Sequence, residues 1–81
     1  MSDVGVLHGD ILLYYQDRVD YASSTVIYYG WAAPGTAETT VKWQIVRETL
    51  DSSQRHTKKE FAQGSIDFTS AWSLRATYTY S

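Results

Sequence analysis

The residues that could perform acid–base or nucleophilic chemistry are few in this sequence. Its imidazoles are His8 and His56, and neither belongs to an H-E-x-x-H, G-x-S-x-G or comparable arrangement. His8 and Asp10 flank Gly9 and could supply two ligands to a metal ion, but zinc takes three or four and no third ligand is evident. A histidine beside a glycine is more typical of a turn. We therefore expect no enzymatic activity, no bound metal and no cofactor.

Two further patterns favour turns over chemistry. Gly35-Thr36 follows Pro34 as in a phosphate-binding loop, but the lysine of such loops is missing and no helix is expected to follow. The aspartates stand mostly at expected chain reversals, which Asp side chains stabilise. These aspartates are Asp10, Asp17, Asp20, Asp51 and Asp67.

A small basic and aromatic surface is the main signal for binding. Four cations surround the turn of an expected hairpin, and a tryptophan lies on the same strand, so stacking and phosphate contacts could hold single-stranded nucleic acid. Interspersed acidic residues weaken the positive electrostatic field of these cations, and the formal net charge is −2. A solvated hairpin is therefore favoured over a nucleic-acid-binding surface. The residues concerned are Arg47, Arg55, Lys58, Lys59 and Trp43, and the acids are Glu48, Asp51 and Glu60.

The composition limits the chain to one small domain. It has 81 residues, of which 43% are apolar and 15% aromatic, and it has no cysteine. A core of this size is marginal, and neither disulfides nor a thiolate metal site can reinforce it. Aromatic packing or burial against other subunits must supply the stability. The rings could stack on sugars, but so small a domain needs most of them as core.

Charge and hydropathy favour a soluble protein. A pI near 5.5 gives no overall attraction to nucleic acid or anionic lipid. The apolar run Ile11–Tyr15 is far shorter than the roughly 20 residues of a membrane span. Residues 1–4 are acidic where a signal peptide would be basic. We expect no membrane partner, and a chain that is kept in the cytoplasm until it assembles.

Residues 1–20 differ from the rest and are expected to form an extended N-terminal arm with one short strand, ahead of a single small β domain over residues 21–81. An apolar run without a partner in its own segment cannot cover itself, so the arm is expected to contact another chain. The expected assembly interface consists of Ile11, Leu12, Leu13, Tyr14, Tyr15, Tyr28 and Trp31.

The rest of the chain predicts a mainly β fold, a small antiparallel sheet or barrel of four to five strands. Residues 25–31 are β-branched or aromatic in both phases, which indicates a strand covered on both sides. After a loop at 33–37, residues 39–50 alternate, with a slip in phase after Ile45 that suggests a bulge or a change of partner. The polar turn 51–54 and a strand at 56–62 complete a hairpin.

A short helical turn and a final strand are expected at the C-terminus. Phe68 and Trp72 lie four residues apart, as on one side of a helical turn. Residues 74–80 alternate, with Leu74, Ala76, Tyr78 and Tyr80 facing inward. The expected core consists of Ile27, Tyr29, Val41, Trp43, Ile45, Phe61, Phe68, Trp72 and Tyr78.

Several short motifs follow one another in a set order: residues 28–37 fit Tyr-x-Gly-x-Ala-x-x-Gly-x-Ala, residues 43–45 are Trp-Gln-Ile, and residues 68–81 fit Phe-x-x-x-Trp-x-x-Arg-Ala-x-x-x-Tyr-Ser. Over residues 25–81 the chain thereby resembles a group of small virion-associated proteins of tailed bacteriophages. Those proteins carry a Trp-Ala-Asp-Gly turn, and this chain departs from it with Phe61 and Gln63.

The resemblance implies a non-enzymatic structural component of a tailed bacteriophage virion. Its place would be in the tail (neck, tube, baseplate or fibre attachment) or, second, on the capsid as a decoration protein. Its partners would be other copies of itself and other virion proteins, and strands that are apolar on both sides fit such lateral packing. The alternative is a small β-barrel module that binds single-stranded nucleic acid.

Overall fold

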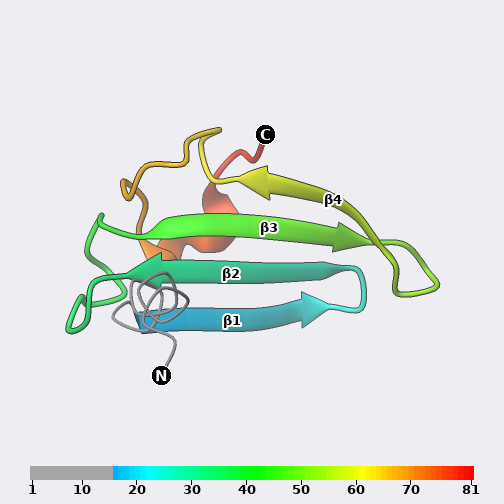
Figure 1. Cartoon of the computed structure of the whole chain (residues 1–81), viewed down its shortest axis with the longest axis horizontal. Coiled ribbons are helices and arrows are strands. Elements are labelled where there is room, and N and C mark those ends of the chain that lie inside the picture. The colour runs from blue at the N-terminus through cyan, green and yellow to red at the C-terminus, as the bar shows by residue number, and fades with distance from the viewer. Residues whose placement is uncertain (1–15) are drawn as a thin grey trace, which may run out of the picture.

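A computed structural model describes residues 16–81, which form one open, four-stranded antiparallel sheet with a short 3-10 helix (Figure 1). The strands follow in the order β1-β2-β3-β4, so each is paired with its neighbour in sequence. The expected class, mainly β with one short helical turn, is confirmed, and the sheet does not close into a barrel. The elements are β1 (Gln16–Ser23), β2 (Val26–Ala32), β3 (Gln44–Leu50), β4 (His56–Phe61) and η1 (Trp72–Thr77).

The domain begins earlier in the sequence than expected, because β1 starts at Gln16. Residues 16–20, expected to belong to the N-terminal arm, pair with β2, and Asp17 lies opposite Trp31. The polar composition of β1 does not predict this strand from sequence alone, because β1 is an edge strand, where charged residues are common. The sheet therefore includes Gln16 to Asp20, and the expectations for residues 1–15, including a short strand at Ile11–Tyr15, lie outside the described residues.

Strand β3 is shorter than expected, since it begins at Gln44 and not at residue 39. The slip in phase after Ile45 is not a bulge, because the register with β2 runs unbroken from Gln44 to Thr49. Ile45 and Val46 point to opposite faces of the sheet, and both are buried, Ile45 in the core and Val46 among the side chains that line a cavity on the other face. The register shift lies further on, between Thr49 and Leu50, where β3 pairs with β4.

One face of the sheet, here called the covered face, carries the core. In Figure 1, η1 lies behind the sheet and packs on this face. The rings of Trp43 and Trp72 meet there with their centroids 6.0 Å apart. Trp43, Ile45 and Trp72 lie in this core as expected. Its buried residues are Ala32, Trp43, Ile45, Ala62, Trp72 and Tyr80, with Tyr28 and Tyr78 packed against them.

Gly30 in the middle of β2 allows the two tryptophans to lie directly on the sheet. A Cβ atom at this position would stand 2.5 Å from Cε3 of Trp72 and 3.3 Å from Cε3 of Trp43. A glycine inside a strand typically marks such a close approach. The core of the covered face therefore depends on the missing side chain.

The C-terminal expectation was wrong in two respects. The helical turn begins at Trp72, where it was expected to end, and η1 occupies residues expected to form a strand. Local hydrogen bonds favour the helix, since Thr77 Oγ1 donates to the Leu74 carbonyl at 2.6 Å and Leu74 N donates to the Ala71 carbonyl at 3.0 Å. Only Tyr80 pairs as in a strand, in a single bridge with Ala62.

Two of the expected core residues are exposed. Val41 is 56% accessible because it lies in the loop before β3, and Phe68 is 38% accessible because it lies in the loop before η1 and not on a helical turn with Trp72. Leu74, expected to face inward, is 47% accessible on η1. Tyr29 and Phe61 are half-buried on the face opposite the core, where they line a cavity.

Candidate functional site

The second face of the sheet is apolar, and no helix or strand of residues 16–81 covers it. Figure 1 looks directly onto this face. The strand register places its side chains in three rows across the sheet. We call this surface the open face. Its rows are Asp17, Trp31 and Gln44; Val19, Tyr29, Val46 and Phe61; and Tyr21, Ile27, Glu48 and Lys59.

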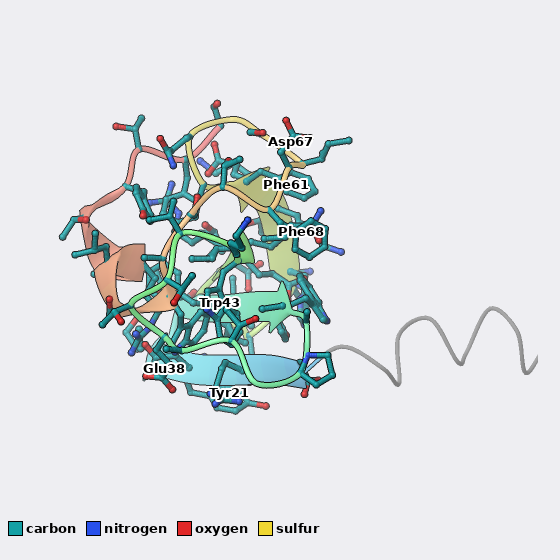
Figure 2. The ribbon with its side chains drawn as sticks, turned by 90° about the vertical axis from the view of Figure 1, so that its left-hand side faces the viewer. Tyr21, Glu38, Trp43, Phe61, Asp67 and Phe68 are labelled. Atoms are coloured by element: carbon teal, nitrogen blue, oxygen red, sulfur yellow. The ribbon has the colours of Figure 1, made fainter. Side chains whose placement is uncertain are left out.

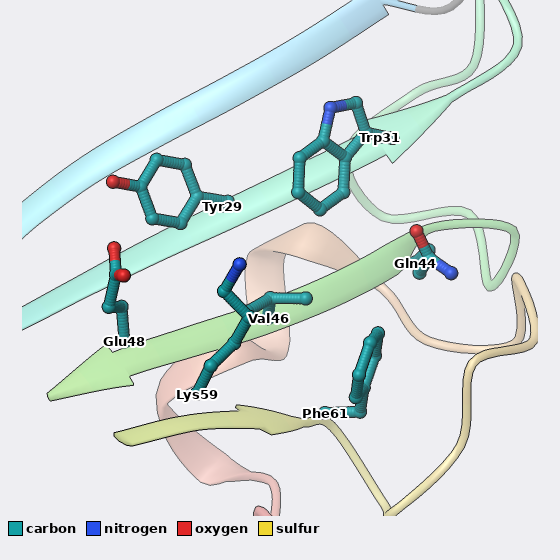
Figure 3. A pocket seen from close by; sticks show the side chains of 7 residues that line it. All are labelled: Tyr29, Trp31, Gln44, Val46, Glu48, Lys59 and Phe61. Carbon is teal, nitrogen blue, oxygen red and sulfur yellow. The ribbon is translucent and has the colours of Figure 1, made fainter. Parts of the chain in front are cut away.

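A shallow cavity of about 340 Å³ occupies the middle of the open face. Figure 3 shows Tyr29 and Trp31 of β2 on one side, Phe61 of β4 on the other, and Val46 between them. The rings of Tyr29 and Trp31 are nearly parallel, at 12°, with their centroids 6.2 Å apart. The cavity can therefore receive a flat or extended apolar group. Its complete lining is Tyr29, Trp31, Gln44, Val46, Glu48, Lys59 and Phe61.

Apolar surface continues from the cavity toward the edge strand β1. Val19 is 47% accessible and Tyr21 is 75% accessible, and both point to the open face (Tyr21 is labelled in Figure 2). Removing such surface from water is worth about 25 cal/mol per Å². An adjoining set of exposed apolar groups on a small domain marks a surface that binds something.

A fixed carboxylate forms the polar end of the cavity. Burial by itself would raise the pKa of Glu48, but hydrogen bonds from His56 and Tyr29 and the positive charge of Lys59 outweigh it, so the pKa lies below its usual value. His56 Nδ1 is 2.5 Å from Glu48 Oε2. Burial and the hydrogen bond to Glu48 raise the pKa of Tyr29, so this hydroxyl stays protonated and donates. An ionised carboxylate held by two partners anchors the face and is poorly placed to accept a proton.

The expected basic and aromatic surface is not formed. Trp43 is fully buried in the core, with its Nε1 donating to the Ala37 carbonyl at 2.9 Å, so no base can stack on it. Lys59 points to the open face, whereas Arg47 and Glu60, one position along each strand, point to the covered face. The cations of the hairpin therefore lie on different sides of the sheet.

The arginines of this hairpin are also tied to carboxylates. Arg47 Nη2 lies 2.9 Å from Glu60 Oε1, and its guanidinium stands 4.7 Å from the ring centroid of Tyr80. Arg55 Nε lies 3.0 Å from an oxygen of Asp51 in the turn. These cations stabilise the hairpin and its core, which leaves little positive field for phosphates.

The turn interpretation is confirmed at Gly35 and Asp51, whereas Asp17 and Asp20 lie within β1 and not at a chain reversal, and Asp10 lies outside the described residues. Thr36 N donates to the Ala33 carbonyl at 3.1 Å, and Gly35 adopts a φ of 88°, so this stretch is a tight turn. Asp51 Oδ1 accepts hydrogen bonds from the backbone N of Ser53 and Arg55. Within residues 16–81, no group of three or more His, Cys, Asp or Glu residues could hold a metal ion. No helix of this stretch is both long and apolar enough to cross a membrane.

The structure places only part of the expected assembly interface on the open face. Trp31 lies on the open face, where a partner could contact it. Tyr28 points to the covered face and packs against Tyr80 with ring centroids 5.7 Å apart, so its assignment to the interface was wrong. The other expected members, Ile11–Tyr15, lie outside the described residues, as do His8 and Asp10.

Sequence reasoning missed Val19, Tyr21 and Val46 as members of the open face. The sequence signal for this face was the stretch 25–31, because apolar residues in both phases of a strand indicate that both faces of the sheet are buried against something. Comparisons with protein-family models, with curated proteins and with solved structures found no match to this chain.

Proposed function

We propose that this chain is a non-enzymatic structural component of a tailed bacteriophage virion that works by repeated lateral packing. The tail, at the neck, tube, baseplate or fibre attachment, is the favoured location, and capsid decoration is the second. The observation that carries the proposal is the open face, with the cavity between Tyr29, Trp31 and Phe61. Its partners are other copies of the chain and other virion proteins.

The need for a second cover supports a role in assembly. A stable sheet buries each of its apolar faces against another layer. Here η1 and the C-terminal segment cover one face, while Val19 and Tyr21 on the other are largely accessible. A domain of this size has little stability to spare. Packing against a neighbour would complete the burial.

The motif residues that resemble the phage proteins support the same role, because they build the fold. Gly30 makes room for Trp72, and Trp43 packs beside Trp72 in the core. Arg75 stacks on Trp72 at 4.5 Å, and its carbonyl accepts a hydrogen bond from the Tyr80 hydroxyl at 2.7 Å. These motif residues therefore have structural roles in the fold of this chain, as a structural component requires.

The proposal is tested by native mass spectrometry of the full chain, alone and with dissociated phage particles, together with quantitative mass spectrometry of purified particles. We expect complexes of several copies and a fixed copy number per particle. A chain that stays monomeric in both mixtures and is missing from purified particles would refute the proposal.

The second candidate, binding of single-stranded nucleic acid, now rests on the open face. The parallel rings of Tyr29 and Trp31 could stack on bases, and Lys59 could contact a phosphate. Asp17 and Glu48 lie on the same face and oppose a phosphate backbone. This balance of charge places the candidate second.

A further inference from the structure

The open face lacks a cover among residues 16–81, and β1 begins at one end of this face. Gln16, the first described residue, pairs with Ala32, next to Trp31. Trp31 and Gln44 lie at this same end of the open face and line its cavity. The residues that precede β1 therefore start next to the uncovered surface.

The composition and length of that segment fit the open face. Ile11–Tyr15 is an unbroken apolar run of five residues. In an extended chain, Ile11, Leu13 and Tyr15 point one way while Leu12 and Tyr14 point the other, so both sides need a cover. Five extended residues span about 16 Å, and the three spacings between four strands add up to about 14 Å. The run can thus cross the whole face.

The sequence before β1 favours the face of a second copy over the chain's own. To return onto its own open face, the chain would have to reverse just before Gln16. No Gly, Pro, Asn or Asp stands between Ile11 and Gln16 to form such a turn. Charge agrees with this docking, since Asp10 precedes the run and Lys59 stands at the rim of the cavity.

We propose that Ile11–Tyr15 of one copy lies in the cavity on the open face of a neighbouring copy, between the rings of Tyr29 and Trp31 and the ring of Phe61. The inference rests on the proposed function, because it names the contact through which copies pack laterally. Each copy gives one segment and receives one. Repetition of this head-to-tail contact forms a closed ring or an open filament.

Complementation between two full-length variants tests the exchange. Leu12→Ser with Leu13→Ser impairs the segment, and Trp31→Gln impairs the face. Each variant alone should be a monomer by native mass spectrometry. Their mixture should form a one-to-one heterodimer, because one variant keeps an intact face and the other an intact segment. Circular dichroism verifies that both variants are folded.

The matched control is Leu74→Ser, which alters an apolar residue that is 47% accessible on η1, away from the open face. It should assemble as the wild type does. Single variants that assemble normally, or a mixture that stays monomeric, would overturn the exchange.

A cysteine trap gives an independent measurement, since the natural chain contains no cysteine. Copies with Leu13→Cys, mixed with copies carrying Lys59→Cys, should form a disulfide-linked dimer under mild oxidation. The control pair, Leu13→Cys with Leu74→Cys, should form at least several-fold less. Equal yields would contradict the proposal.

The two proposals fail separately. A wild-type chain that is monomeric in solution, yet present at fixed copy number in purified particles, would overturn the exchange and leave the structural role standing. Exchange between copies of a chain missing from particles would refute the virion role and leave the exchange standing.

Discussion

Gly30 and the two tryptophans above it show how single residues determine the covered face. The ring of Trp72 lies so close to the β2 backbone that any side chain at residue 30 would displace it. Gly30→Ala should therefore destabilise the fold by about 1–3 kcal/mol, the usual cost of overpacking. Urea unfolding followed by tryptophan fluorescence measures the change. Ser24→Ala, in the exposed β1–β2 turn, is the control and should have little effect.

Tryptophans on the two faces of the sheet should differ in how much they contribute to the stability of the isolated chain. Trp43→Ala removes a fully buried ring and should cost roughly 3–5 kcal/mol, a large part of the stability of a small domain. Trp31→Ala removes a half-buried ring from the open face and should cost the isolated monomer much less. Thermal unfolding of dilute samples, monitored by circular dichroism, compares them. Similar losses from both substitutions would contradict the assignment of Trp31 to a surface awaiting a partner.

At the scale of elements, the corrected boundary of β1 leads to a prediction about truncation. A chain that lacks residues 1–15 keeps all of β1, whereas one that lacks residues 1–20 loses five of its eight residues. The longer deletion also removes Asp20, whose carboxylate lies 2.9 Å from Arg75 Nε and ties β1 to η1. We expect near-native melting of the first protein and a clearly lower melting temperature for the second. Identical melting curves would show that β1 adds nothing to the domain.

Glu48 on β3 interacts with Tyr29 on β2 and with His56 and Lys59 on β4, and these interactions lead to a prediction about pH. The pKa of Glu48 is lower in the folded chain than its ordinary value, so its contribution to stability is fully present above the unfolded pKa of about 4.3 and is lost as the pH falls through the folded pKa. Acidification from about pH 5 to pH 3 should lower the urea midpoint, and Glu48→Gln should reduce that fall. Lys42→Gln, which changes an exposed charge, is the control and should keep the wild-type slope.

The elements differ in how far the sequence could predict them. Strand β2 and the β3–β4 hairpin carry their own signals, namely apolar residues in both phases and a polar turn at Asp51. Strand β1 carries few, because it is an edge strand whose pairing depends on β2. The C-terminal alternation fits both a strand and a short helix, and the contact of Trp72 with Gly30 decides between them through tertiary packing. Local periodicity cannot contain that information.

At the scale of the whole molecule, the open face could be foreseen only in part. Apolar residues in both phases of β2 indicate two covers, but not which strands complete each face. Once the register places Val19, Tyr29, Val46 and Phe61 in one row, the partner surface becomes visible. The order of the strands, which no short motif encodes, assembles the candidate site.

The two proposed functions differ in how binding depends on salt. If the open face held single-stranded nucleic acid, affinity for an oligonucleotide would fall steeply between about 50 and 200 mM salt, by roughly 0.7 in the logarithmic slope for each neutralised phosphate. We expect no binding at micromolar protein. The formal net charge is −2, and Asp17 and Glu48 offset Lys59 on the face itself. Fluorescence anisotropy with a labelled oligonucleotide makes the measurement. Salt-sensitive binding that disappears in both Trp31→Gln and Lys59→Glu would instead assign the open face to nucleic acid, because one substitution removes a stacking ring and the other reverses a phosphate-binding charge.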